Sequence, residues 1–214
     1  MNKVNFSETL QTYIDNYDGE NYRVWNTTEG LVAEIRKEIR NHYKIEQRYK
    51  CCYCRQQNLQ DHGLVWDCEH ILPKAIYPAF LFEPFNLALS CKECNQAKEK
   101  YKNKLIKVSC SIYSLKSEDY RIIHPHFDTY SDHIEISSLN GTIIFKVLEN
   151  SEKGKFTYIC CNFIRYEKKL VGYSEVNNNV ALTINKLLEE GIAVEDILEG
   201  LLNKDTPIHM EIDF

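Results

Sequence analysis

The chain carries CCYC at residues 51–54 and CKECNQAK at residues 91–98, and these two stretches decide its fold. Each contains a CxxC pair, and 36 residues separate the two pairs. The four cysteines of the pairs are Cys51, Cys54, Cys91 and Cys94. Four thiolates presented by two such turns suit one tetrahedral zinc ion, with Zn–S bonds of about 2.3 Å. Because four sulfur ligands leave no coordination position open, the pattern predicts a structural zinc.

Cysteine usage along the whole chain favours metal binding over disulfide bonds. There are nine cysteines, an odd number, and six of them fall between residues 51 and 94. Thiols of a cytosolic chain stay reduced and are available to a metal. Cys52 and Cys54 form an alternative CxC pair, but a CxxC turn delivers both sulfurs to one ion more readily. Four further cysteines are expected to be small core residues: Cys68, Cys110, Cys160 and Cys161.

Between the two pairs lies the motif DCEHILPK, in which an acid, Glu69, stands next to an imidazole, His70. Neighbouring side chains point to opposite faces of an ideal strand. They can serve one site only at a strand end or an irregular turn, and the proline that follows is consistent with such a turn. Two asparagines complete the pattern: Asn86 opens a second short apolar stretch, and Asn95 directly follows the last cysteine.

These residues together resemble the HNH endonuclease family over about residues 49–104. The matching elements are the paired cysteines, Glu69-His70 with Pro73, Asn86-Leu87, and Cys94-Asn95 with Lys98. The resemblance implies a ββα-metal fold, a hairpin and a helix pinned together by the zinc. It also implies phosphodiester hydrolysis with a catalytic Mg²⁺ or Mn²⁺ ion that is separate from the zinc.

The resemblance assigns a role to each matching side chain. It implies that His70 is the general base that takes a proton from the attacking water. It implies that Glu69 and Asn95 hold the catalytic divalent ion, Asn95 standing where many members have histidine. It implies that Asn86 braces the loop that carries the histidine. Lys98, one helical turn beyond Asn95, is placed to meet a phosphate.

Other side chains near the motif are candidates of the same kind. Asp67 shares a strand face with Glu69 and is a weaker candidate ligand of the ion. Lys74 and Lys92 join Lys98 as candidate nucleic-acid contacts. The chemistry agrees with these roles, because Mg²⁺ prefers oxygen ligands and keeps several waters. An imidazole with an unperturbed pKa near ~6.5 suits a general base at neutral pH.

The charge is unevenly distributed along the chain. The net charge of −5 argues against nucleic-acid binding. Residues 34–55, however, carry seven Lys or Arg against three Glu, and residues 92–107 carry six Lys against two Glu. Residues 175–214 carry nine acids against two lysines. Basic segments therefore flank the cysteine-rich region, and a local basic face binds phosphates despite a negative total.

The sequence predicts an α+β fold in three parts. A helical segment covers residues 1–48, with helices over 6–17 and 29–48, the second capped by Thr27 or Thr28. The nuclease core covers residues 49–106 and the remaining part covers residues 107–214. Hydrophobic residues make up 43% of the chain, enough for a packed core. With no membrane-length apolar stretch and no apolar signal region at the N-terminus, a cytoplasmic location is expected.

Within the core, strands are expected over residues 64–71 and 86–89 and a helix over 92–104. The third part is expected to be mixed and then helical. An Asn-Gly pair at residues 140–141 predicts a hairpin, and helical pieces are expected over residues 156–203, broken at Asn177–Asn179 and Gly191. The leucines and isoleucines between residues 182 and 202 would form the core face of these helices.

A second polar cluster, HPHFDTYSDH, contains His124, His126, Asp128 and His133. It is either a second metal site or, more simply, a loop packed against the nuclease core.

The function expected from these observations is a metal-dependent DNA endonuclease. Two alternatives stay open: a zinc-knuckle module that binds nucleic acid or protein without turnover, and an RNase with the same centre. The overall layout also resembles HNH subunits of bacterial anti-phage systems, such as the PtuB-type nuclease of Septu and those of retron cassettes. That resemblance implies a PtuA-like, ABC-type ATPase partner, with the acidic C-terminal region as the partner surface. A free-standing restriction-like nuclease is the simpler rival.

Overall fold

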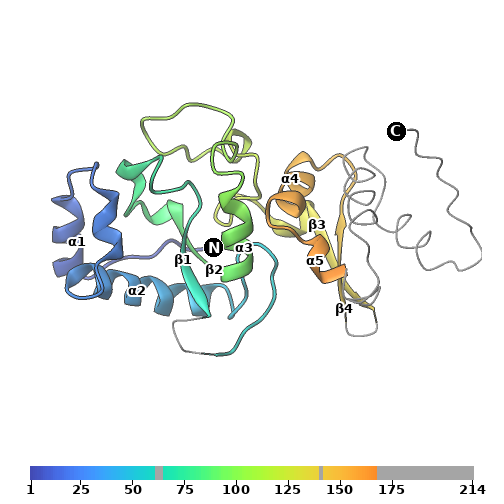
Figure 1. Ribbon diagram of the computed structural model, residues 1–214, viewed down its shortest axis with the longest axis horizontal. Coiled ribbons are helices and arrows are strands. Elements are labelled where there is room, and N and C mark those ends of the chain that lie inside the picture. The colour runs from blue at the N-terminus through green and yellow to red at the C-terminus, as the bar shows by residue number, and fades with distance from the viewer. Residues whose placement is uncertain (61–64, 140–141, 168–214) are drawn as a thin grey trace, which may run out of the picture.

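The computed structural model describes residues 1–60, 65–139 and 142–167. Over these residues the fold is α+β, as expected, with two separate two-stranded antiparallel sheets (Figure 1). The helices are α1 (Glu8–Asp15), α2 (Leu31–Glu46), α3 (Lys92–Glu99), α4 (Glu152–Cys160) and α5 (Ile164–Glu167). The strands are β1 (Trp66–His70), β2 (Leu87–Cys91), β3 (Ile134–Leu139) and β4 (Thr142–Val147).

Helix α2 forms because its apolar residues recur every three or four positions. Val32, Ile35, Ile39 and Tyr43 are buried along this stripe, and the stripe packs against β1 and β2. The expected cap at Thr27 or Thr28 is wrong, because the residue before the first helical turn is Gly30. Its φ of 72° lies in the left-handed region, which glycine adopts without a steric penalty.

The β1–β2 hairpin and α3 follow one another along the chain as strand, strand and helix. Cα pairing runs from Trp66 opposite Cys91 at one end to His70 opposite Leu87 at the other. Both strands start later than expected, and α3 ends at Glu99 rather than at residue 104. The residues after α3 are mostly Lys and Asn, which give a helix no apolar face to pack, so the chain continues in short turns.

The loop between β1 and β2 contains two short 3₁₀ helices, η2 (Pro78–Phe80) and η3 (Pro84–Asn86). Each begins with proline, whose fixed φ suits the first helical position and whose missing N–H is not needed there. A third 3₁₀ helix, η1 (Tyr22–Asn26), precedes α2. Among the described residues, no helix is both long enough and apolar enough to cross a bilayer.

The second hairpin is confirmed, because β3 pairs with β4 and Leu139 lies opposite Thr142; the Asn-Gly pair itself lies outside the described residues. Helices α4 and α5 pack on β4. The expected helical region is interrupted at Asn162, which has a φ of 52°. The expected breaks at residues 177–179 and 191, the apolar face over 182–202 and the acidic region from residue 175 all lie outside the described residues.

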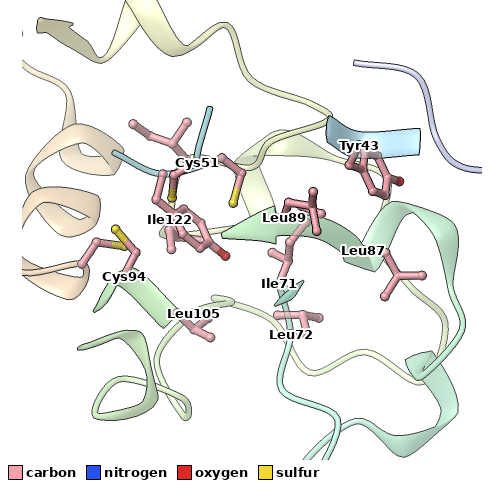
Figure 2. Close-up of a cluster of buried hydrophobic side chains, with 14 of the residues drawn as sticks. Tyr43, Cys51, Ile71, Leu72, Leu87, Leu89, Cys94, Leu105 and Ile122 are labelled. Atoms are coloured by element: carbon pink, nitrogen blue, oxygen red, sulfur yellow. The ribbon is translucent and has the colours of Figure 1, made fainter. Parts of the chain in front are cut away.

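The buried apolar residues form one continuous cluster that extends from Val4 to Ile164. Figure 1 shows α1 and α2 on one side, the β1–β2 hairpin and α3 in the middle, and the second hairpin with α4 and α5 on the other side. Figure 2 shows Cys51 and Cys94 at one end of the central core and Leu72 and Leu87 toward the other. The cysteine pairs are therefore built into the core rather than attached to its surface.

Candidate metal and catalytic centre

The four cysteines of the two CxxC pairs converge at one end of the β1–β2 hairpin. Their sulfurs all lie within 4.8 Å of one another, and Cys54 and Cys91 are 3.9 Å apart, Sγ to Sγ. A tetrahedral zinc with ~2.3 Å bonds requires sulfurs roughly 3.8 Å apart, so the cluster fits a zinc site. Cys52 does not belong to the cluster, and its backbone N–H donates to the Leu89 carbonyl at 3.0 Å. The CxxC interpretation is confirmed and the CxC alternative is wrong.

Side chains from the C-terminal end of the described chain hydrogen-bond to these sulfurs. Arg165 donates from Nη2 to Cys94 Sγ at 3.1 Å, and the Tyr166 hydroxyl donates to Cys54 Sγ at 3.2 Å. Contact with the thiol of Cys161 is the leading cause that lowers the pKa of Cys94 to about 5. Four thiolates around Zn²⁺ carry a net charge of −2, and such donors disperse it. Cys161 therefore borders the four-cysteine cluster, and it is also a buried core residue as predicted.

At the other end of the hairpin lies a pocket of about 280 Å³. Three parts of the chain form its walls: η1, the end of β1 with the turn that follows it, and α3 with the turn after it. The residues that line it include Tyr22, Asn26, Glu69, His70, Lys74 and Asn95. Three candidate catalytic residues of the motif, Glu69, His70 and Asn95, therefore border a cavity.

Glu69 and His70 share this pocket because they are the last two residues of β1. Their side chains point to opposite faces of the strand, as neighbours do. Glu69 contacts Lys98 of α3, and the ring of His70 contacts Trp25 of η1. Since the pocket lies at the strand end, it reaches both faces.

The carboxylate of Glu69 is 1% exposed and is held by two donors. Lys98 Nζ lies 2.5 Å from Oε1, and the Tyr53 hydroxyl donates to the same oxygen at 2.8 Å. Lys98 also donates to the carbonyl oxygens of His70 at 2.8 Å and Ile71 at 3.1 Å. The Lys98 ammonium is therefore buried and joins α3 to the end of β1, unlike the phosphate contact expected from the sequence.

The imidazole of His70 is 6% exposed and has a defined orientation. Its Nε2 lies 3.0 Å from the carbonyl oxygen of Leu81. Because a carbonyl only accepts, Nε2 must carry the hydrogen, and Nδ1 of the neutral ring is left as an acceptor. Burial lowers the pKa of His70 to about 3, with the charge of Lys74 as the next cause. The ring is therefore neutral at physiological pH.

Asn86 is fully buried and joins the two ends of the β1–β2 loop. Its Oδ1 accepts from the Leu72 N–H at 2.7 Å, and its Nδ2 donates to the carbonyl oxygens of Leu72 at 3.1 Å and Phe80 at 3.0 Å. These three bonds fix the turn after His70 relative to η2. Asn86 contacts backbone groups of the loop and is not among the residues that line the pocket.

Asn95 lies one turn into α3 and borders the pocket. Its Nδ2 donates to Asp67 Oδ2 at 2.9 Å, so its Oδ1 is the atom left to bind a cation. Asp67 also pairs with Lys92 through Oδ1 at 2.9 Å. Asp67 is not among the residues that line the pocket, so it orients Asn95 from the side. Lys74 does line the pocket, whereas the half-exposed Lys92 forms an ion pair with Asp67.

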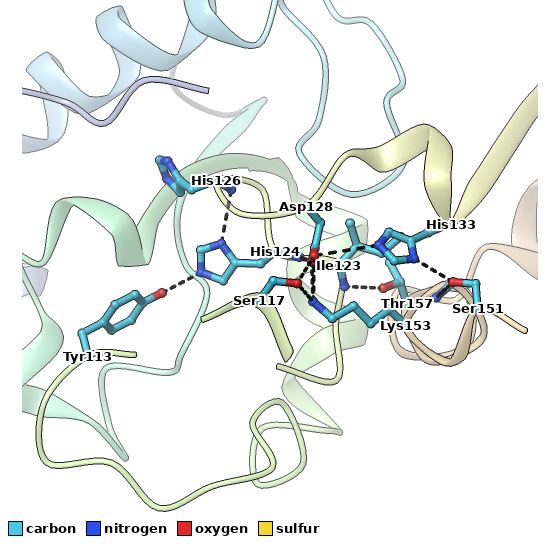
Figure 3. Close-up of polar contacts among 11 residues, drawn as sticks. Tyr113, Ser117, Ile123, His124, His126, Asp128, His133, Ser151, Lys153 and Thr157 are labelled. Atoms are coloured by element: carbon cyan, nitrogen blue, oxygen red, sulfur yellow. Dashed lines mark hydrogen bonds and ion pairs between the residues drawn. The ribbon is translucent and has the colours of Figure 1, made fainter. Parts of the chain in front are cut away.

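The histidine cluster after residue 120 is a packed loop (Figure 3). His124 Nε2 lies 2.9 Å from the Tyr113 hydroxyl, and His126 Nε2 lies 2.8 Å from the Leu87 carbonyl oxygen. His133 Nδ1 lies 2.8 Å from Ser151 Oγ. Over the described residues, the four clustered cysteines are the one group of three or more His, Cys, Asp or Glu with converging ligand atoms. The histidine cluster therefore packs against the core, and its ligand atoms do not converge as those of the four cysteines do.

Four further side chains contact the candidate catalytic or metal-binding residues, and none of them was predicted from the sequence. Trp25, Arg165 and Tyr166 contact the candidate catalytic or metal-binding side chains from outside the motif stretches, and Tyr53 contacts Glu69 from within the first stretch. Tyr53 stands between two cysteines of the first pair, which is the one sequence signal among them. The other three lie far from the motif along the chain.

No protein-family model matches the chain. Over 140 residues the chain is 30% identical to the Septu protein PtuB of Bacillus thuringiensis. The match covers 65% of this chain and 46% of that protein, so the chain spans about half the length of the relative that it matches.

Proposed function

We propose that this protein is a metal-dependent endonuclease of the HNH type that hydrolyses phosphodiester bonds of DNA. The observation that carries the proposal is a buried, neutral histidine with one free ring nitrogen, next to a carboxylate and an amide at a pocket. A strand, strand and helix joined by a four-cysteine cluster support the same assignment. A module that only binds nucleic acid needs no such histidine.

His70 is the proposed general base. Its Nδ1 takes a proton from the water that attacks the phosphorus, while Nε2 stays bonded to the Leu81 carbonyl. An imidazole with a pKa near 3 is a weak base before substrate binds. A phosphate that enters the pocket brings negative charge, which stabilises the imidazolium and raises this pKa. The negative charge of the phosphate therefore favours proton uptake by His70, and the charge of the divalent ion at Glu69 and Asn95 opposes it.

Glu69 and Asn95 are the proposed ligands of the catalytic Mg²⁺ or Mn²⁺. Tyr53 and Lys98 both bind Oε1 of Glu69, so Oε2 is the oxygen assigned to the ion. Asn95 contributes Oδ1, because its Nδ2 is used by Asp67. One carboxylate and one amide oxygen, completed by water, fit the preference of Mg²⁺ for few protein ligands. When bound, the ion supplies positive charge to the phosphoryl oxygens and the leaving 3′ oxygen.

The basic residues around the pocket support a polyanionic substrate. Lys74 and Lys102 line the pocket, and Lys102 is about half exposed. The net charge of the whole chain is −5, but residues 92–107, which supply Lys98 and Lys102 to the pocket, carry six Lys against two Glu. We propose Lys74 and Lys102 as phosphate contacts, whereas Lys98 stabilises the site by pairing with Glu69.

The biological role that we propose is anti-phage defence. The similarity to part of the Septu protein PtuB supports it. A PtuA-like, ABC-type ATPase is the proposed partner, and the acidic residues 175–214, which lie outside the described residues, are the proposed partner surface. Recovery of such an ATPase with the tagged chain from a native host would support this role. Recovery of the chain alone would count against it.

Cleavage of supercoiled plasmid by the purified chain with Mg²⁺ tests the activity. His70→Ala should lower the cleavage rate by roughly 10²–10⁴-fold, the usual contribution of a general base. His42→Ala is the matched control, because His42 is a partly buried histidine of α2 that does not line the pocket and whose Nε2 lies 3.1 Å from the carbonyl oxygen of Asn2. Equal rates for His70→Ala and the parent would show that the proposed base is wrong.

Two substrates separate the alternatives. A labelled RNA of the same sequence, cut faster than the DNA, would assign the centre to an RNase. Binding of either nucleic acid without turnover at any concentration of Mg²⁺ or Mn²⁺ would assign the chain to a binding module.

A further inference from the structure

The 3₁₀ helix η1 forms one wall of the candidate catalytic pocket, although it precedes Glu69 and His70 by more than forty residues in the sequence. Tyr22 and Asn26 line the pocket from this helix. Between them, Trp25 is 7% exposed, and its ring centroid lies 4.4 Å from that of His70 with the ring planes 73° apart. An aromatic residue from the N-terminal segment thus contacts the proposed base directly.

Trp25 is itself held from two sides. Its ring lies 6.0 Å from that of Phe82, which follows Leu81 in the β1–β2 loop. Arg36 of α2 donates to the carbonyl oxygens of Trp25 and Thr27, and its guanidinium lies 5.8 Å from the centroid of the indole. The position of η1 is therefore fixed by α2, which packs on the hairpin.

The imidazole of His70 needs both of its neighbours to keep one orientation. The bond from Nε2 to the Leu81 carbonyl fixes one ring nitrogen. A single hydrogen bond still permits the ring to tilt about the bonded atom, and a tilt moves Nδ1. The indole of Trp25 in edge contact occupies the space into which the ring would tilt.

We propose that Trp25 is a positioning residue for His70, whose indole holds the imidazole with Nδ1 directed at the substrate pocket. The N-terminal segment is then part of the catalytic centre and not an appendage to it. This inference rests on the proposed nuclease function. It assigns no proton transfer to Trp25, which acts through His70.

Two substitutions that preserve an apolar core separate positioning from folding. Trp25→Phe keeps an aromatic ring and should retain kcat within about threefold. Trp25→Leu keeps apolar bulk but loses the flat ring, and should lower kcat by roughly 10–100-fold with KM nearly unchanged, because small misplacements of a reacting group cost about that much. Steady-state cleavage of a labelled duplex with saturating Mg²⁺ gives both constants.

A partly buried aromatic residue elsewhere is the control. Phe156→Leu alters a ring that packs on Tyr101, on the other side of α3 from the pocket residues. It should lower the melting temperature without changing kcat. If Trp25→Leu also changes only the melting temperature, Trp25 is a core residue and the proposal is overturned.

A measurement on the chain without substrate distinguishes this proposal from the proposed function. Long-range ¹H–¹⁵N spectra of histidine-labelled protein should show hydrogen on Nε2 of His70 in both proteins, because the bond to Leu81 remains, and the Nδ1 signal should shift and broaden in Trp25→Leu, where the ring tilts. That result supports positioning even if the parent cuts no nucleic acid, in which case the nuclease function alone fails. Identical His70 signals in parent and variant would overturn the proposal even if both cut DNA.

Discussion

The two ends of the β1–β2 hairpin differ in the chemistry that they present. Near Cys91, four sulfurs lie within 4.8 Å of one another and have protein donors around them. Near His70, oxygen and nitrogen atoms border a pocket of about 280 Å³. The first end has the geometry of a closed structural metal site. The second has side chains that are fixed on one side and open to a ligand on the other.

We propose that this difference separates stability, at the sulfur end, from chemistry, at the pocket end. Soft sulfur ligands bind zinc tightly and leave no position for substrate. Hard oxygen donors bind Mg²⁺ loosely and leave room for water and phosphate. A single, readily exchanged ion would bind too loosely to stabilise the fold. If the two ends are independent, a substitution at one end leaves the function of the other unchanged.

The largest effect is expected from the sulfur end. Cys51→Ser should abolish zinc binding and the folded state, since a structural zinc contributes about 10–16 kcal/mol in zinc-finger peptides, as much as the ~5–15 kcal/mol stability of a typical domain. Zinc content and far-UV circular dichroism measure both. Cys110→Ser, at a partly buried cysteine outside the cluster, is the control and should behave as the parent. Normal zinc content and melting of Cys51→Ser would contradict the structural role.

The next effect concerns the buried ion pair that supports the open end. Lys98→Met leaves the Glu69 carboxylate, 1% exposed, without its cation and should lower the free energy of unfolding by about 3–5 kcal/mol. Adding Glu69→Gln to this variant should restore part of the stability, because the unpaired charge is removed. Lys102→Met, at an exposed pair with Glu99, should change stability by less than about 1 kcal/mol. Chemical denaturation compares the three.

Failure of the double variant to recover any stability would show that Lys98 acts through its bonds to the His70 and Ile71 carbonyls rather than through Glu69.

The smallest effect concerns His124, which is buried as His70 is but does not line the pocket. Burial holds the pKa of His124 well below its ordinary value, with His126 and Lys153 as further causes. In the unfolded chain the His124 imidazole takes up a proton near pH 6.5, whereas in the folded chain it stays neutral. Stability is therefore lost as pH falls below that value. The slope should approach about 1.4 kcal/mol per pH unit for this group.

His124→Phe, which keeps a ring to stack on Phe127, should flatten this slope between pH 6.5 and 5. Denaturation at several pH values measures it. An unchanged slope would show that other groups cause the acid sensitivity.

The sulfur end could be predicted from the sequence because CxxC spacing fixes the ligands locally. The hairpin, α2 and the place of Glu69 and His70 at a strand end also followed from local pattern. The surroundings of the open end did not, because Trp25 reaches His70 only through tertiary packing. The burial of Lys98 was missed for a related reason: a lysine on a polar helix gives no local sign that a buried carboxylate lies opposite.

Brief EDTA treatment followed by rapid buffer exchange tests the separation of the two ends most directly. The same sample is then assayed for plasmid cleavage, zinc content and circular dichroism. We expect cleavage to stop while about one zinc per chain and the folded spectrum remain, and Mg²⁺ alone to restore cleavage. Cleavage that persists without added divalent ion, or that returns only with zinc, would contradict the division between a structural zinc and a catalytic pocket at Glu69, His70 and Asn95.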